Sequence, residues 1–190
     1  TGPDDAPSPA RSPAPQRPLG WAEPGTHPLR GIRRRTAEVM ARAWSQIPHI
    51  TVNDDVDASR LLAARDTLRS QLGASHTRVT VLHLALVAAA QALRHHPIVN
   101  ASLDAEAVNV TVHRQLNIGI AVATPDGLLV PVLRDVDRKG VAELARECTD
   151  LAERARRRRL SPSELAGGTF TITNYGAFGG THATPIIRPP

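Results

Sequence analysis

Residues 116–136, "LNIGIAVATPDGLLVPVLRDV", contain two apolar runs separated by a short polar insert. The runs at 116–124 and 128–136 are rich in Val, Ile and Leu, which favours strands. The insert "PDG" at 125–127 is typical of a tight turn, because its proline presets one backbone angle and its glycine permits a positive φ. This stretch therefore predicts two strands joined by a turn.

Helices are expected on the N-terminal side of these strands. Residues 29–44 repeat apolar positions at helical spacing with arginines on the other face, which predicts an amphipathic helix that ends near Pro48. A second helix follows Asp57, whose carboxylate is placed to cap it. The third begins at Thr80, a candidate N-cap, and is closed by Pro97. Its sequence is apolar nearly all round, so we expect it to be deeply buried.

Further strands and one more helix complete the pattern. Residues 49–59 alternate apolar and polar side chains, as a half-buried strand does, and 107–113 are also strand-like. After 136, a helix is expected over 140–159, a short turn at 161–164 and a glycine-bounded strand over 167–174. Helices mixed with strands in this order predict an α+β fold, with helices packed on a largely antiparallel or mixed sheet.

Composition limits the class of protein. The chain has 190 residues, 41% of them hydrophobic, enough for one core, and a net charge of +5 carried almost wholly by arginine, since Lys139 is the one lysine. Residues 1–27 are rich in proline and alanine without apolar periodicity, so we expect a disordered interdomain linker followed by one domain over 28–190. No run approaches the roughly 20 apolar residues of a membrane span. With a single cysteine, the sequence suits a reducing, cytoplasmic location.

Three features that could carry chemistry have simpler interpretations. Cys148 lies on an apolar helical stripe, so core packing is favoured over a nucleophilic role. His95 and His96 are adjacent on a helix and point in different directions, so no metal site is predicted. The arginine run at 154–159 is interpreted as a solvated helix end, rather than as a nucleic-acid site.

The strand over 167–174 combines glycines with alternating threonines. Thr169, Thr171 and Thr173 are two residues apart, which places them on one face of a strand. A rigidly held hydroxyl there could stabilise the oxyanion of an acyl-transfer intermediate. The alternative is that threonine was selected for its strand propensity. The residue pattern leaves both interpretations open.

The sequence resembles the catalytic domain of dihydrolipoamide acyltransferases, the core component of 2-oxoacid dehydrogenase complexes. The resemblance covers roughly residues 28–190 and is carried by four stretches in order: "IPHITVNDDVD" (47–57), "HPIVNASLD" (96–104), "LNIGIAVATPDGLLVPVLRDVD" (116–137) and "LAGGTFTITNYGAFGGTHATPIIRPP" (165–190). It implies a chloramphenicol-acetyltransferase-like two-layer α+β sandwich, incomplete at the C-terminus, that forms trimers and then a larger core.

The resemblance also implies site residues. Thr173 matches the family's serine or threonine that hydrogen-bonds the tetrahedral intermediate, and Asn174 lies beside it near the thiol end of coenzyme A. Arg65 and Thr80 fall where family members contact coenzyme A. Ala123 replaces an aspartate found in some relatives, so contacts to coenzyme A are expected to differ there.

The implied reaction is transfer of an acyl group from acyl-dihydrolipoamide to coenzyme A. The lipoyl group would be carried by a separate upstream domain, and the implied partners are the 2-oxoacid decarboxylase/dehydrogenase and dihydrolipoamide dehydrogenase components, with no nucleic acid and no membrane. The family's HxxxDG motif, which supplies the histidine base, is not in this sequence, so we expect the chain alone to be inactive. Two alternatives remain: a non-catalytic structural core subunit, or a coenzyme A-dependent acetyltransferase with a small-molecule acceptor.

Overall fold

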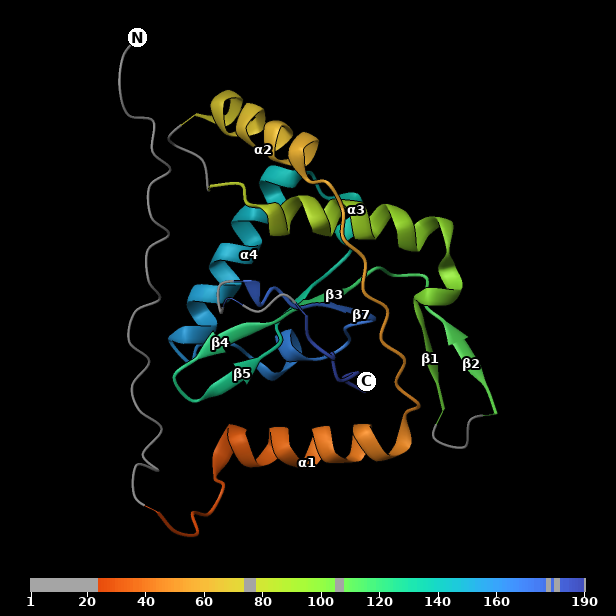
Figure 1. Ribbon diagram of the computed structural model, residues 1–190. Coiled ribbons are helices and arrows are strands. Elements are labelled where there is room, and N and C mark those ends of the chain that lie inside the picture. The colour runs from red at the N-terminus through yellow and green to blue at the C-terminus, as the bar shows by residue number, and fades with distance from the viewer. Residues whose placement is uncertain (1–23, 74–77, 105–107, 177–178, 180–181, 190) are drawn as a thin grey trace.

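Three short strands form the centre of the molecule, in the order β6 (Val132–Leu133), β3 (Ile118–Ile120) and β7 (Phe170–Ile172). β3 is antiparallel to β6 and parallel to β7, which confirms the expected mixed sheet. The structure is a computed structural model, and it describes residues 24–73, 78–104, 108–176, 179 and 182–189. Figure 1 shows the central strands between α3 and α1.

The predicted "PDG" turn joins two strands, as expected. β4 (Val122–Thr124) and β5 (Gly127–Leu129) pair antiparallel, and Gly127 has a φ of 138°. Each predicted long strand is broken in two, however. The amide of Ala121 makes the last bond of the β3–β7 pairing, to the Ile172 carbonyl, and β4 then pairs with β5 in a different sheet. Pro131 has no N–H to donate and interrupts the second run between β5 and β6.

A second hairpin lies beside the central sheet (Figure 1). It pairs β1 (Ala101–Leu103) antiparallel with β2 (Val110–Val112), and the 3-10 turn η1 (Pro97–Val99) precedes it. β2 was predicted from the sequence, whereas β1 was not among the expected strands.

The helices are α1 (Gly31–Gln46), α2 (Ser59–Leu72), α3 (Val81–His95) and α4 (Val141–Arg156), close to the predicted ranges. Short 3-10 turns are formed by η2 (Val136–Arg138) and η3 (Pro162–Leu165). Thr80 precedes α3 with extended backbone, and its amide donates to Nδ1 of His83 over 3.0 Å. The Asp57 carboxylate accepts the amide of Ser59, the first residue of α2, over 2.9 Å. Both predicted helix starts are thus confirmed.

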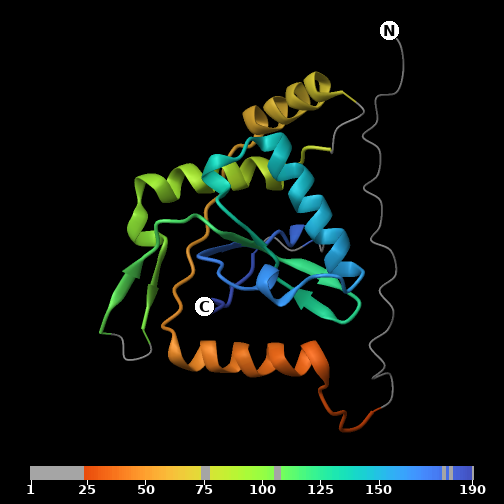
Figure 2. The same cartoon turned by 180° about the vertical axis from the view of Figure 1, so that it is seen from behind.

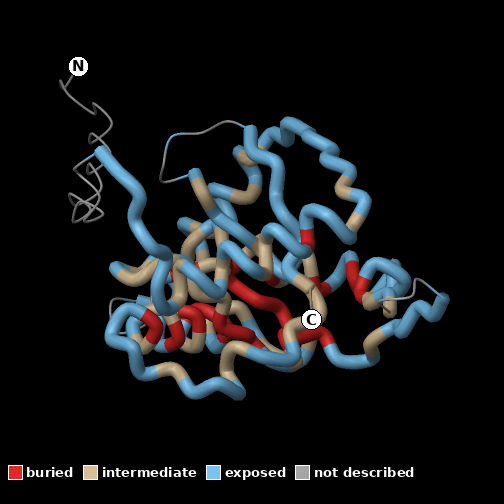
Figure 3. The backbone as a smooth tube through the Cα atoms, turned by 90° about the horizontal axis from the view of Figure 1, so that it is seen from below, coloured by how far each residue is buried: buried red, intermediate tan, exposed pale blue. Residues whose placement is uncertain are grey.

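The hydrophobic core lies between the central sheet and the helices α3 and α4, which pack against each other. Figure 3 shows the buried residues gathered inside a largely exposed outer layer, and Figure 2 shows from behind how α4 runs down one side of the sheet. The fully buried members include Leu86, Ile118, Leu133 and Leu144. Cys148 is part of this core, as predicted.

The prediction that α3 is deeply buried holds for one face only. Only His83, Leu86, Ala90 and Leu93 are buried, and they mark a single face. Val81 keeps 39% of its surface exposed. Ala88 and Ala92 on the exposed side are small and apolar, which made the helix look apolar nearly all round in sequence.

The prediction of a strand over 49–59 is also wrong. Residues 47–58 have no helix or strand and run from α1 to α2 along the molecule (Figure 1). Ile50, Val52 and Val56 are exposed by 88%, 80% and 83%. Alternating side chains favour a strand only where a neighbouring strand completes the hydrogen bonds, and no strand within the described residues pairs with this segment.

The N-terminal linker expected over 1–27 falls mostly outside the described residues. Residues 24–27, which are described, are exposed and lie in no helix or strand. Among the described helices, none is long and apolar enough to span a membrane.

Candidate active site

Thr173 directly follows the last residue of β7 and is exposed. The strand alternates, because Phe170 and Ile172 pack against the core while Thr171 is exposed. The carbonyl of Ile172 accepts the amide of Ala121 over 3.1 Å, which anchors the backbone one residue before Thr173. The hydroxyl of Thr173 is therefore carried by the end of an anchored strand, where a substrate can reach it.

Gly119 allows β7 to lie close to its neighbours. A Cβ atom at this position would come 2.7 Å from Cγ1 of Val130 and 3.3 Å from Oγ1 of Thr171, its partner in register. Such contacts are shorter than van der Waals packing permits. Gly119, which the sequence analysis did not single out, thus permits close packing inside the central sheet, next to the strand that carries Thr173.

Asn174 forms a local turn after β7. Its Oδ1 accepts the amide of Gly176 over 3.2 Å, and the side chain is exposed. This bond orients the side chain beside Thr173, as an asparagine in a turn commonly does.

Arg65 and Thr80 lie in a corner formed by α2 and the start of α3. Arg65 makes a two-pronged contact with Asp66, of 2.9 Å and 3.0 Å, and this contact raises the pKa of Arg65. Nε of Arg69 donates to the Val79 carbonyl over 2.7 Å, tying α2 to the residue before Thr80. Arg65 therefore lies one helical turn before the residue that ties α2 to the segment preceding Thr80.

The corner between α2 and α3 carries more positive than negative charge. Burial lowers the pKa of Arg69, and the nearby Arg78 and Arg65 lower it further. Three guanidinium groups thus face one carboxylate, that of Asp66, whose own pKa is lowered chiefly by its bond to Arg65. Guanidinium groups in excess over carboxylates suit a phosphate-bearing ligand. The sequence analysis missed both Arg69 and Arg78. Arg69 could have been found, because its spacing of four from Arg65 places the two arginines on one face of α2.

The two parts of the predicted site are separate. Figure 1 shows α2 on one side of α3 and β7 on the other. Across the described residues, no hydrogen bond or ion pair joins Thr173 or Asn174 to Arg65 or Thr80. A ligand that contacts both would have to be long, as coenzyme A is.

Other reactive side chains are structural. Burial, with a contribution from Glu147, raises the pKa of Cys148 to about 12, which removes the thiolate at neutral pH. Oγ of Ser102 lies 2.7 Å from Nε2 of His113 across the β1–β2 hairpin, but within the described ranges no carboxylate orients that ring. The described part of the chain contains no group of three or more potential metal ligands.

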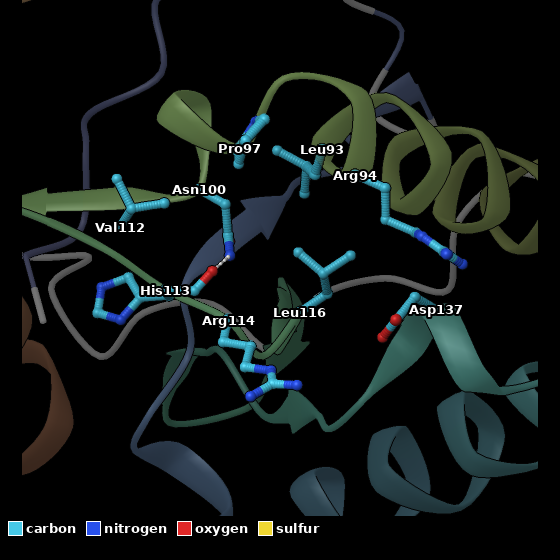
Figure 4. A pocket seen from close by; sticks show the side chains of 9 residues that line it. All are labelled: Leu93, Arg94, Pro97, Asn100, Val112, His113, Arg114, Leu116 and Asp137. Carbon is cyan, nitrogen blue, oxygen red and sulfur yellow. Dashed lines mark hydrogen bonds between the residues drawn. The ribbon is translucent and has the colours of Figure 1, made fainter.

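A pocket of about 380 Å³ lies between the end of α3 and residues 112–116 (Figure 4). The fully buried Asn100 lines it and donates through Nδ2 to the carbonyls of His113 and Gln115, over 2.9 Å and 3.0 Å. Its Oδ1 has no partner among the described residues. None of the four predicted site residues lines this pocket.

Comparison with known proteins identifies the family. The family model for 2-oxoacid dehydrogenases acyltransferase (catalytic domain) matches residues 22–190. The chain belongs to this acyltransferase family. Among curated relatives, the dihydrolipoyllysine-residue acetyltransferase component of the pyruvate dehydrogenase complex of Cupriavidus necator is 40% identical over 162 residues, 85% of this chain and 29% of that protein. The succinyltransferase component of the 2-oxoglutarate dehydrogenase complex of Haemophilus influenzae is 38% identical, over 86% of this chain and 40% of that protein. The chain thus spans less than half the length of these acyltransferase subunits.

Solved structures of acyltransferase cores share the fold. The dihydrolipoamide acetyltransferase of Azotobacter vinelandii has a TM-score of 0.84 at 36% identity, covering 94% of this chain and 74% of that one. Its structural study concerns the roles of a serine, a histidine and an asparagine in its catalytic mechanism. The truncated catalytic core from Thermoplasma acidophilum has a TM-score of 0.81 at 36% identity, covering 87% and 75%. The expected chloramphenicol-acetyltransferase-like α+β fold is confirmed.

Proposed function

We propose that this chain is the catalytic domain of an acyltransferase subunit that transfers an acyl group from acyl-dihydrolipoamide to coenzyme A. The observation that carries the proposal is the likeness to the Azotobacter acetyltransferase, which extends over 94% of the chain at 36% identity. Two features of the chain support it. An exposed hydroxyl stands at the anchored end of β7, and a corner rich in guanidinium groups lies at α2 and α3.

Thr173 is assigned the role of oxyanion donor. In the proposed reaction the thiol of coenzyme A passes its proton to a general base, which the family resemblance assigns to the histidine of the HxxxDG motif, and its sulfur adds to the thioester carbonyl of the acyl-dihydrolipoamide; the same base returns the proton to the leaving sulfur. The carbonyl oxygen then takes up negative charge, which the hydroxyl of Thr173 stabilises by donating a hydrogen bond. Collapse of this intermediate breaks the old carbon–sulfur bond and releases dihydrolipoamide. Asn174 is assigned to the thiol end of coenzyme A.

Arg65 and Thr80 are assigned to binding of coenzyme A. The phosphates of coenzyme A are the anions that the α2–α3 corner would bind, and Arg69 and Arg78 add to its positive charge. The lipoyl group would arrive on a separate domain. We further propose that the chain forms trimers that build a larger core with the decarboxylase/dehydrogenase and dihydrolipoamide dehydrogenase components. A cytoplasmic location is in keeping with the free, buried Cys148 thiol.

The oxyanion role is tested by substitutions at Thr173 in the natural full-length subunit. An oxyanion donor acts when charge develops in the transition state, so Thr173→Val should lower kcat by about 10²–10³ with little change in KM for coenzyme A. Thr173→Ser keeps the hydroxyl and should be mild. Thr171→Val, two residues earlier on β7, is the matched control and should leave kcat near normal. If Thr173→Val kept near-normal turnover, Thr173 would not be the oxyanion donor and would serve only to favour the strand.

The binding role of the corner is tested at Arg65. Hydrogen bonds to charged groups contribute roughly 1.5–3 kcal/mol, so Arg65→Ala should raise KM for coenzyme A by about one to two orders of magnitude while kcat changes little. The measurement is steady-state kinetics with coenzyme A varied. Arg60→Ala, on the same helix and exposed, is the control. An unchanged KM for Arg65→Ala would remove Arg65 from the coenzyme A site.

A further inference from the structure

Asn117 connects three segments of the molecule although it belongs to none of the predicted sites. It lies directly before β3 and keeps only 6% of its surface exposed. Its Nδ2 donates to the carbonyl of Gly167 over 3.1 Å, and its Oδ1 accepts the amide of Asp135 over 3.0 Å. Both polar atoms of the side chain are therefore used, one toward the segment before β7 and the other toward the segment after β6.

The backbone of Asn117 also contacts the segment before β7. Its amide donates to Oγ1 of Thr169 over 3.2 Å. Its carbonyl accepts the amides of Thr169 and Phe170, over 2.7 Å and 3.3 Å. Residues 167–170 are thus held by one residue, and these contacts are called the Asn117 clamp. Arg134, which donates to the carbonyls of Ser163 and Ala166, holds the chain only up to the residue before Gly167.

The register of β7 depends on this clamp. β7 is three residues long and, among the described strands, pairs only with β3 at the edge of the sheet, with Phe170 opposite Ile118. A slip of one residue would turn each β7 side chain to the other face of the sheet. Thr173 lies three residues beyond Phe170, so its position follows from the position of this strand.

We propose that Asn117 is a positioning residue for Thr173, which acts by locking the start of β7 to β3 and to the end of β6. Catalytic groups need placement to within about 0.5 Å, a tolerance that a loosened edge strand does not meet. Asn117 itself does not touch the reacting atoms. The proposal rests on the proposed function for its kinetic consequence, whereas the clamp on β7 can be measured without any activity.

The kinetic test is a double-mutant cycle in the natural full-length subunit. Asn117→Ala should lower kcat about tenfold or more with KM for coenzyme A little changed, because the loss falls on transition-state stabilisation. In a Thr173→Val background the same change should lower kcat by less than about twofold, since the group that it positions is gone. If Asn117→Ala lowers kcat by the same factor in both backgrounds, Asn117 does not act through Thr173.

Asn100→Ala is the matched control. Asn100 is also a buried asparagine that donates to two carbonyls, but those belong to His113 and Gln115 rather than to the β7 segment. Whatever its effect on kcat, the factor should be equal in the wild-type and Thr173→Val backgrounds. Asn117→Asp provides a milder variant if Asn117→Ala fails to fold, because it keeps an acceptor for the Asp135 amide and loses the donor to Gly167.

The structural test is amide hydrogen exchange at the two ends of the β3–β7 pairing. The Phe170 amide donates to Asn117 and the Ala121 amide donates to Ile172. In Asn117→Ala or Asn117→Asp both amides should exchange about tenfold faster, whereas Asn100→Ala should leave them unchanged. Unchanged exchange in the Asn117 variants would overturn the positioning role. If the Asn117 variants exchange faster but the wild-type protein shows no acyl transfer, the proposed function is wrong, while the contacts of Asn117 with the β7 segment are still supported.

Discussion

Cys148 shows how burial sets the chemistry of a single side chain. Its thiol lies in the core among residues of α3, α4 and the central sheet, and burial raises its pKa to about 12. The folded protein should therefore react very slowly with iodoacetamide at pH 8, and the unfolded protein should react at the rate of a free cysteine. Mass spectrometry after timed quenching measures both rates. Rapid alkylation of the native protein would show that the α3–α4 layer opens.

Gly119 should be intolerant of the smallest side chain. The added methyl of Gly119→Ala meets Cγ1 of Val130 at 2.7 Å, so we expect a loss of about 1–3 kcal/mol in the free energy of unfolding, the usual range for overpacking. Denaturant titration measures it. Combining the change with Val130→Ala removes the obstructing methyl and should recover part of the loss. An additive double variant would contradict the steric explanation.

The structural roles of residues were predictable where their partners were local. Thr80 and Asp57 start helices through neighbours two or three residues away, which sequence spacing reveals. Asn117 could not be found in this way, because its partner Gly167 is 50 residues distant. Arg78 was missed for a similar reason, since its closeness to Arg69 depends on how α2 meets α3.

At the level of elements, helices were predicted more accurately than strands. A helix completes its hydrogen bonds within itself, so α1 and α4 lie close to their predicted ranges. A strand depends on a neighbour that the local sequence does not specify. The run at 116–124 was predicted as one strand but divides where Ala121 bonds to Ile172 of β7, and the segment 49–59 has no paired strand at all in the part of the chain that is described.

The junction between α4 and η3 should depend on pH. Glu164 accepts the amide and hydroxyl of Ser161 and pairs with Arg154, and these contacts lower its pKa from 4.5 to about 2. Because the folded pKa is depressed, the stabilisation is complete above about pH 4.5 and is lost as the pH falls toward 2. Glu164→Gln should therefore lower Tm at pH 7, and the difference from wild type should shrink to a small fraction of that value near pH 2.

The control for this junction is Glu153→Gln. Glu153 is exposed and its contact with Arg157, at 3.6 Å, is that of a surface pair. Its substitution should leave Tm nearly unchanged from pH 7 to pH 2. A Tm difference for Glu164→Gln that stayed constant over this range would mean that the charge of Glu164 does not stabilise the junction.

At the level of the whole molecule, exposed apolar side chains predict self-association. Ile50, Val52 and Val56 are exposed by 80% or more, and Leu103 and Val108 of the β1–β2 hairpin region by 57% and 75%. Exposed apolar side chains that gather within short segments favour an interface. The natural subunit should therefore sediment as a trimer or larger particle at micromolar concentration.

A triple substitution of Ile50, Val52 and Val56 to serine tests that prediction. These side chains contribute little to the core of the described molecule, so the variant should keep its Tm while its sedimentation coefficient falls. Substitution of exposed arginines on α1, such as Arg34 and Arg35, is the control and should not change the assembly. A wild-type subunit that remains monomeric would contradict the interface.

The parallel pairing of β3 with β7 has a consequence for how the protein is made. One edge of β3 meets β6 about a dozen residues after it is synthesised, but the other edge must wait about fifty residues, or roughly 3–10 s at ribosomal rates, until Phe170–Ile172 emerge. Throughout that interval Ile118 and Ile120, which are buried in the finished molecule, flank an open strand edge. The nascent chain should therefore be most prone to aggregation, and most in need of chaperones, while α4 is being translated.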